Sequence, residues 1–476
     1  MARWHLVCAV SRRSELRTEY GSRVEGLAHA NMGAMRAKIA TGAAKVKGAV
    51  PGGAASIGLG IAIASIASYV FVVVTLNSLD GGAKAAFSAF WAVIFVVGPG
   101  FFLPMEQEVG RAVAYRRAQG DGSRPLVAKA FKLGAGLTVI LIVVTVALSP
   151  LLSKEIYNGD QFFTVALAIS LVSFFLLHLS RGVLAGEGRF RPYAEIIAID
   201  AIVRLLMAIG LVLAGVTSAG IFALCIGLAP LVALPFAMRG QRQILKPGTD
   251  APFGELSKNL GWLLAGSVLM QALAYSPLLG VNSLGGPEDE AIVAGFASAF
   301  FIARLPVLAF GAIQGVLLPK LAGLAGSGQK DEFKSGLEKL LALVVAIAVL
   351  GTVGAYVLGP TVGKILFKDF TMSANGLALL AAGSGVFIIA LTLAQALMAL
   401  GGHRMTAIAW SLGLVVAIVC MALIHGLELR VDLGFLLGSM LTTVVMFIAV
   451  VRRRARMDDL GVGVLVDAIE HEPIEI

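Results

Sequence analysis

Long apolar runs, separated by short polar stretches, repeat along the chain from Gly52 to Val451. Twelve of these runs are long enough to supply the about 20 mainly apolar residues that a helix needs to cross a membrane. Their apolar residues do not alternate with polar ones, as they would in the strands of a membrane β-barrel. We therefore predict an all-α polytopic membrane protein with helices over residues 52–76, 85–106, 128–150, 161–186, 194–214, 218–238, 259–282, 291–321, 340–362, 374–400, 405–424 and 433–451.

The amino-acid composition supports a membrane location. Of the 476 residues, 58% are hydrophobic and 14% are charged, against roughly 25% charged residues in an ordinary soluble domain. Cys8, Cys225 and Cys420 are scattered, and the last two lie inside apolar runs, where cysteine behaves as a small hydrophobic residue. The sequence therefore predicts no disulfide, no metal site and no cofactor.

Positive charge is distributed unevenly among the segments that connect the predicted helices. If the N-terminus is cytoplasmic, the inner segments carry 28 Lys and Arg residues and the outer loops carry five. Cytoplasmic segments of membrane proteins are enriched in these residues, so we expect both termini in the cytoplasm. The net charge of +9 then lies mostly on the cytoplasmic face, where it attracts anionic membrane lipids, and it requires no nucleic acid.

A polar stretch at residues 239–258 divides the predicted helices into two sets of six that share short motifs. Pro104 lies 215 residues before Pro319, and Gly188 lies 214 residues before Gly402. An even number of crossings gives both sets the same orientation, which predicts a parallel repeat with substrate held between the two bundles. We expect a basic cytoplasmic leader (1–51), an N-terminal bundle (52–238), a cytoplasmic linker (239–258), a C-terminal bundle (259–451) and a cytoplasmic tail (452–476).

Arg304 lies about midway along the eighth predicted helix, in the stretch FIARLPVLAFGAIQGVLLPKLA. A charged side chain at such depth is costly to insert, and it usually faces a cavity, a partner or a substrate. The only deep carboxylate in the predicted helices is Asp200, which has Arg204 one turn away on the same helix face. We therefore expect Arg304 either to bind an anion in a cavity or to make structural hydrogen bonds.

Asp200 and Arg204 have two interpretations of their own. As an i, i+4 pair, they can neutralise each other and fix the fifth helix against its neighbours. Alternatively, Asp200 is a candidate for proton coupling, and Arg204 adds a second cation to a substrate cavity. We expect His178, near the end of the fourth helix, to be a packing residue rather than a proton relay.

The seventh helix carries a polar stripe. Ser267, Gln271, Tyr275 and Asn282 are spaced by 4, 4 and 7 residues, which places them on one helix face. Gln271, Tyr275 and Asn282 are candidate contacts for the hydroxyl groups of a sugar. Hydrogen bonds between helices are the alternative explanation for the stripe.

Prolines interrupt the second and eighth helices of the chain. Pro104, Pro306 and Pro319 each remove a helix hydrogen bond, and such breaks in membrane helices commonly line cavities or allow bending. We therefore predict these three residues to be hinge or cavity-wall positions. No nucleotide-binding motif or cluster of metal ligands is present in the sequence, so we do not expect an enzyme.

Several of these stretches resemble one protein family. The eighth helix RLPVLAFGAIQGVLLPKLA and the turn LLAGEGRFRPYAEI, within twelve helices in two halves, are similar to the polysaccharide-flippase branch of the multidrug/oligosaccharidyl-lipid/polysaccharide (MOP) exporter superfamily. The resemblance covers about residues 52–451. It implies two six-helix bundles that open alternately to either side of a bacterial plasma membrane, with a polyprenyl-linked sugar as cargo for envelope polysaccharide biosynthesis.

The resemblance also implies roles for particular residues and partners. Arg304 matches a basic residue of the eighth helix that meets the lipid-linked diphosphate in peptidoglycan-precursor flippases, with Arg204 as an additional candidate. Envelope glycosyltransferases or polymerases are expected partners. Two other functions stay open: a cation-coupled multidrug exporter of the same superfamily, for which Asp200 is the candidate coupling residue, and a transport-inactive membrane scaffold for envelope enzymes.

Overall fold

The computed structural model describes residues 54–157, 159–241, 243–252, 260–307, 330–368 and 370–459, together with residues 254, 256 and 310. Within these ranges twelve helices are long and apolar enough to cross a membrane, and all regular structure is helical, which confirms the predicted fold class. The helices are α2 (Ala54–Ser78), α3 (Gly81–Ala118), α4 (Arg124–Glu155), α5 (Phe162–Gly186), α6 (Phe190–Leu213), α7 (Ala219–Ala237), α8 (Leu260–Leu284), η2 (Pro287–Asp289), α9 (Glu290–Ala303), α11 (Lys330–Leu366), α12 (Ala374–Ala399), α13 (His403–Leu423) and α14 (Leu427–Asp459).

Large apolar side chains are exposed along the outward faces of several helices. Examples are Val139 and Ile140 on α4, and Val357 and Leu358 on α11, all more than half exposed. A continuous surface of this kind is a liability in water, but it is stable against lipid acyl chains. The chain is therefore a multi-pass membrane protein.

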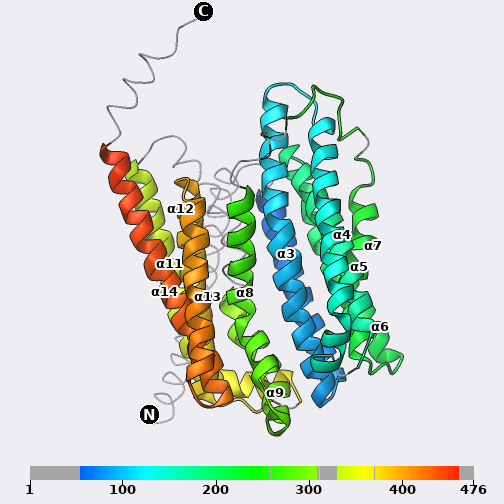
Figure 1. The fold of residues 1–476 in the computed structure, drawn as a ribbon, viewed down its shortest axis with the longest axis vertical. Helices are drawn as coiled ribbons and strands as arrows, with labels where there is room; N and C mark the ends of the chain where they lie inside the picture. The colour runs from blue at the N-terminus through cyan, green and yellow to red at the C-terminus, as the bar shows by residue number, and fades with distance from the viewer. Residues whose placement is uncertain are drawn as a thin grey trace, which may run out of the picture. The chain divides into compact units, whose positions relative to one another are not determined.

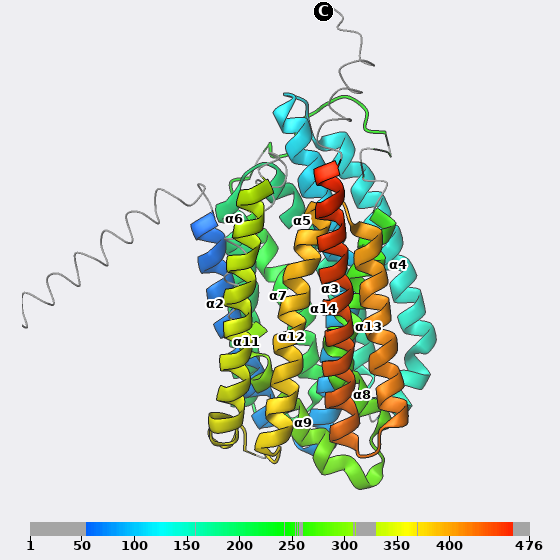
Figure 2. The ribbon, with the colours of Figure 1, turned by 90° about the vertical axis from the view of Figure 1, so that its left-hand side faces the viewer.

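The helices from Ser56 onward form one compact unit. Among the first six helices, α5 packs against α3, α4 and α7, and α6 packs against α7 (Figure 1). Among the last six, α14 packs against α12 and α13, and α11 packs against α12 (Figure 2). Helices α3 and α8 lie side by side and join the two sets (Figure 1). This is the predicted arrangement of two six-helix bundles.

The turns after α5 and α12 show the internal repeat. Gly188 has a φ of +70° and Gly401 has a φ of +72°, a left-handed conformation that glycine adopts without strain. The glycine equivalent to Gly188 is thus Gly401, and not Gly402 as the sequence spacing predicted. Gly402 instead precedes α13 as its N-terminal cap residue.

The polar end of α3 extends well beyond the predicted helix end at residue 106. It is held there by Arg116, whose Nη1 donates to the carbonyl oxygens of Gly122 at 3.1 Å and Thr249 at 2.9 Å. Its Nη2 donates to the carbonyl oxygen of Asp250 at 3.0 Å. The linker between the two sets of helices therefore folds over the end of α3.

The leader (1–51), Pro319 and the tail beyond residue 459 lie outside the described residues.

Candidate functional site

Arg304 lies at the end of a helix and not in the middle of a continuous one. Helix α9 ends at Ala303, and Arg304 is its C-terminal cap residue, with φ −95° and ψ 1°. Pro306 follows, buried, and it has no N–H to donate to the carbonyl of Ile302 four residues earlier. Residues 305–307 are helical again, so the helix predicted without interruption over residues 291–321 is broken at Arg304, where the proline favours a turn.

One backbone carbonyl and three aromatic rings surround the guanidinium group of Arg304. Its Nη1 donates to the carbonyl oxygen of Ala274 at 3.1 Å. Its Cζ lies 4.7 Å from the ring centroids of both Tyr275 and Phe300, and 6.0 Å from that of Phe387. A cation over an aromatic face is attracted by the ring quadrupole, at about 0.5–2 kcal/mol per contact.

A proline in α8 lies close to the carbonyl that Arg304 contacts. Pro277 has no N–H for the carbonyl of Leu273, which instead accepts a hydrogen bond from the Ser276 hydroxyl at 2.9 Å. The next carbonyl, that of Ala274, lies in the same bend and accepts from Arg304. Carbonyls freed at a bend in a membrane helix need such partners from neighbouring side chains.

No carboxylate forms an ion pair with Arg304 within the part of the chain that the structure describes. The ion pairs deep in the helices link Arg204 to Asp200, and Arg181 to Glu106. Neither carboxylate approaches Arg304. The positive charge expected from the sequence is therefore not neutralised by an acidic side chain among the described residues.

Arg304 lines a cavity of about 240 Å³. A cavity that holds one water molecule needs a volume of only about 10–15 Å³, so this cavity has room for a ligand group. Tyr275 and Gln271 of α8 lie in the same wall, as do Trp91 of α3 and Phe387 of α12. The structure thus brings together Arg304, Gln271 and Tyr275, three of the predicted substrate contacts.

Helix α2 contributes hydroxyl groups to this cavity, which sequence analysis did not identify. Ser65, Ser68 and Tyr69 line it at spacings that place them on one face of the helix. The Tyr69 hydroxyl is buried and has no hydrogen-bond partner among the described residues. A buried hydroxyl group usually has a partner, so this one is available to a ligand.

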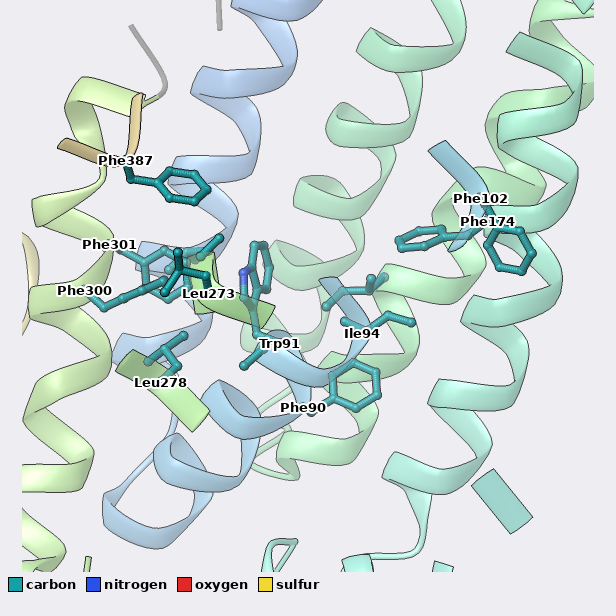
Figure 3. Close-up of a cluster of buried hydrophobic side chains, with 14 of the residues drawn as sticks. Phe90, Trp91, Ile94, Phe102, Phe174, Leu273, Leu278, Phe300, Phe301 and Phe387 are labelled. Atoms are coloured by element: carbon teal, nitrogen blue, oxygen red, sulfur yellow. The ribbon is translucent and has the colours of Figure 1, made fainter. Parts of the chain in front are cut away.

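Aromatic rings form the remaining wall of the cavity. Trp91 stacks on Phe95 with ring centroids 4.5 Å apart, and it meets the edge of Phe301 at 5.3 Å. Figure 3 shows Trp91 of α3 directed toward Phe300 and Phe301 of α9. The cavity therefore combines one cation, several hydroxyl groups and a largely apolar wall.

The polar stripe of α8 mostly bonds to α3. The Gln271 amide donates to the carbonyl oxygen of Phe95 at 2.9 Å, which is the carbonyl that Pro99 leaves without a helix partner. The Asn282 amide donates to the Ser88 hydroxyl at 3.1 Å. The alternative of interhelical hydrogen bonds therefore applies to both amides, and Asn282 is not in the lining of the Arg304 cavity.

Arg204 and Asp200 form the expected i, i+4 ion pair on α6. Both side chains are buried, and the Arg204 guanidinium lies 5.9 Å from the ring centroid of Phe71. One Asp200 carboxylate oxygen, Oδ1, has no hydrogen-bond partner among the described residues. Neither residue is in the lining of the Arg304 cavity, so the structure does not bring Arg204 together with Arg304.

A buried carboxylate that the sequence did not reveal is the partner of His178. Oε2 of Glu106, on α3, lies 2.7 Å from the His178 Nδ1. Its Oε1 lies 3.1 Å from the Arg181 Nη2 and accepts a hydrogen bond from the Tyr193 hydroxyl at 2.8 Å. Asp200 is thus not the only deep carboxylate, and His178 takes part in a hydrogen-bonded cluster in the N-terminal set of helices.

A second, smaller cavity of about 60 Å³ lies beside the first. Pro104 lines it, whereas Pro306 instead lies against Gly351 of α11. Met270 and Leu391 belong to the walls of both cavities.

No group of three or more His, Cys, Asp or Glu side chains suited to a metal ion occurs within the described ranges.

Comparison of the sequence finds relatives of comparable length. Two uncharacterized proteins of Mycobacterium tuberculosis are each 25% identical to this chain, over 416 and 419 residues. Each alignment covers 84% of this chain and 92% of the relative. No protein-family model matches the chain.

Comparison of the structure finds transporters. The outward-facing form of a multidrug resistance MATE family transporter of the MOP superfamily superposes with a TM-score of 0.64 at 16% identity, over 86% of this chain and 96% of that one. The inward-facing form gives a TM-score of 0.61 at 14% identity, over 83% and 95%. A MOP superfamily transporter from Pyrococcus furiosus, whose reversed binding-pocket polarity suggests a different function, gives 0.64 at 14% identity, over 86% and 96%. The chain therefore has the fold of the MATE transporters.

Proposed function

We propose that this protein, which has the fold of the MATE transporters, moves a polyprenyl-phosphate-linked saccharide across the bacterial plasma membrane for cell-envelope polysaccharide biosynthesis. The observation that carries the proposal is the Arg304 cavity. A guanidinium group that pairs with no carboxylate among the described residues is suited to an anion, and its planar fork matches phosphate oxygens. In transporters built from two repeats, substrate sites commonly lie between the repeats near the middle of the membrane.

Each part of the proposed substrate has a matching surface. The phosphate binds Arg304, and Tyr275 supports the guanidinium group from one side. The sugar hydroxyl groups bind the hydroxyl groups of α2 and the side-chain oxygen of Gln271, whose amide nitrogen bonds to Phe95. The polyprenyl tail stays in the lipid. Arg204 is neutralised by Asp200 in this conformation, so the phosphate is assigned to Arg304 alone.

The charge of Arg304 lowers the free-energy cost of moving the phosphate group away from water. A phosphate group loses its water shell when it leaves the membrane surface, at a cost of several kcal/mol. Arg304 offsets this cost through charge-assisted hydrogen bonds, each worth about 1.5–3 kcal/mol. The bundles then close on one side and open on the other, with both termini in the cytoplasm.

Replacement of Arg304 tests the proposal. Arg304→Ala should weaken the binding of a phosphorylated head group by about 10- to 100-fold, the equivalent of one such hydrogen bond. Cells that carry only this variant should accumulate lipid-linked saccharide on the cytoplasmic leaflet, measured by extraction and mass spectrometry. Arg304→Lys should retain partial activity, because it keeps the charge and loses the fork.

A matched control is Arg191→Ala on α6, which removes an exposed guanidinium group whose partner, Glu195, is also exposed. This variant should keep a normal lipid-linked saccharide profile. Membrane fractionation establishes that all variants insert equally. Normal polymer production with Arg304→Ala, at a normal amount of inserted protein, would contradict the proposal.

The alternative function is a cation-coupled multidrug exporter. The shared fold with multidrug resistance MATE transporters favours it, and so do the aromatic rings of Trp91, Phe300 and Phe301, which suit a lipophilic cation. Arg304 opposes it, because a fixed cation in the cavity repels a cationic drug. Loss of the protein should sensitise cells to cationic drugs if this alternative holds.

A third possible function, a transport-inactive scaffold for envelope enzymes, predicts a different set of variant phenotypes. Such a protein would tolerate removal of the charge in its cavity. Arg304→Ala would then leave both the drug sensitivity and the lipid-linked saccharide profile unchanged, whereas deletion of the whole protein would not.

A further inference from the structure

Asp432 is a buried carboxylate far from the Arg304 cavity along the chain. It lies on α14, five residues after the helix begins at Leu427, and only 1% of its surface is exposed. Its Oδ1 has no hydrogen-bond partner within the described residues. A buried polar atom without a partner is unusual in a native structure and requires an explanation.

The helices packed against α14 supply no cation for this carboxylate. They are α8, α12 and α13. Residues 374–399, which form α12, include no ionisable side chain. The only ionisable side chains of α13 are His403 and Arg404, at the opposite end of that helix, and Cys420. The ionisable side chain of α8 is Tyr275, which contacts Arg304.

The nearby turns supply no cation either. Glu428 lies one helical turn before Asp432 and adds a second negative charge. The Nη2 of Arg430 donates to the carbonyl oxygen of Leu284 at 2.7 Å. The ion pairs among the described residues include neither Arg430 nor His425. An ionised Asp432 would therefore be a buried charge that no cation among the described residues compensates.

A proton satisfies this carboxylate better than a metal ion. An isolated ionised carboxylate in a low-dielectric interior is strongly unfavourable, and the neutral acid avoids that cost. A metal ion would need several oxygen ligands. The next buried oxygen on α14 without a partner is the Ser439 Oγ, two turns away and about 10 Å along the axis. That distance is too great for one ion to contact both.

We propose that Asp432 is a proton-binding site, occupied when α14 is packed against α12 and α13. Because the proton is bound in the packed state, raising the pH removes it and weakens that packing. The conformational equilibrium of the C-terminal bundle then depends on pH. Proton binding at Asp432 does not require the proposed function, whereas its coupling to substrate movement rests on it.

Infrared difference spectroscopy of the purified full chain in lipid nanodiscs tests the site directly. The protonated carboxyl band should be present in the wild type near neutral pH, and the difference between wild type and Asp432→Asn should isolate it. Glu428→Gln is the matched control, because it removes a neighbouring carboxylate on the same helix and should leave the band in place. Absence of a protonated band assigned to Asp432 would overturn the proposal.

Thermal stability as a function of pH gives an independent readout. The wild type should lose stability as the pH rises above about 3.9, where Asp432 ionises in the unfolded chain but keeps its proton in the folded one. Asp432→Asn and Asp432→Leu, both neutral at this position, should not show that loss. Equal pH dependence in the wild type and these variants would contradict proton binding. Stabilisation by sodium chloride over choline chloride, lost with Asp432→Asn, would overturn the proton in favour of sodium.

The outcome is separable from that of the proposed function. Arg304→Ala should keep the Asp432 band and the pH-dependent stability even though it loses transport. If the band is lost with Asp432→Asn but transport by the wild type proves insensitive to a proton gradient, then the site binds a proton without coupling it. That result would overturn only the coupling.

Discussion

Two partly buried arginines differ in whether a carboxylate accompanies them, and this difference predicts different effects on stability. Arg181 lies 3.1 Å from Glu106 and donates to the Tyr193 hydroxyl at 2.8 Å. Arg304 has one backbone carbonyl and aromatic rings around it. We compare Arg181→Met with Arg304→Met, since methionine keeps the unbranched apolar side chain and removes the charge.

The Arg181 substitution should be costly. Removal of one member of a buried ion pair leaves the other uncompensated, which typically destabilises a protein by about 3–5 kcal/mol. Glu106 keeps hydrogen bonds to His178 and Tyr193, so we expect the lower end of that range, about 3 kcal/mol.

The Arg304 substitution should be close to neutral. It loses one hydrogen bond of about 1.5–3 kcal/mol and its two closest cation–π contacts, to Tyr275 and Phe300, of about 0.5–2 kcal/mol each. It also removes the desolvation of a partly buried cation, which costs several kcal/mol. These contributions are of similar size and opposite sign, so the net change in the free energy of unfolding should lie within about 1 kcal/mol of zero.

Unfolding in mixed micelles of mild detergent and sodium dodecyl sulfate, followed by tryptophan fluorescence, measures both changes. The Arg304→Met protein should unfold near the wild-type midpoint and should fail to transport. A loss of stability for Arg304→Met as large as that for Arg181→Met would refute the reasoning. In that case the guanidinium group would be a structural element of the α8 bend.

Two further predictions concern hydrogen bonds. Gln271→Leu should cost about 1–3 kcal/mol in the same unfolding assay because it leaves the Phe95 carbonyl unpaired, whereas Ser267→Ala, which removes a bond of 3.4 Å, should be near neutral. Hydrogen bonds from Thr249 hold the pKa of the Asp121 carboxyl below its ordinary value of about 3.9. The contact therefore stabilises the folded linker above that pH, and this stabilisation is lost as the pH falls through the lowered pKa. Thr249→Val should therefore shift the acid-induced proteolytic cleavage of the linker to a higher pH; an unchanged pH would contradict this role.

The number of membrane helices was predictable because it depends on local properties of the sequence. An apolar run of sufficient length must form a helix in lipid, whatever packs against it. The end of α9 at Arg304 was predictable in principle as well, because Pro306 disfavours the helical conformation of the residues just before it. Hydropathy alone treats a run that contains a proline as continuous, and this is why the prediction missed the interruption at Arg304.

The partners of the polar side chains were not predictable, because they come from distant parts of the chain. Glu106 and His178 are 72 residues apart, and no spacing within a helix indicates their contact. Asp432 was missed for a different reason. It follows the polar stretch HGLELRV, so the hydropathy pattern assigns it to the edge of the membrane, whereas packing of α14 against its neighbours buries it.

The seam between α3 and α8 shows how prolines serve both stability and movement. Pro99 frees the carbonyl of Phe95 in α3, and Gln271 of α8 satisfies it. Asn282 adds one more hydrogen bond across the seam, to Ser88. At about 0.5–1.5 kcal/mol each, the two bonds contribute only about 1–3 kcal/mol. A substrate that binds one conformation a few kcal/mol more tightly than the other can therefore offset the loss of these two bonds when a bundle movement separates α3 from α8.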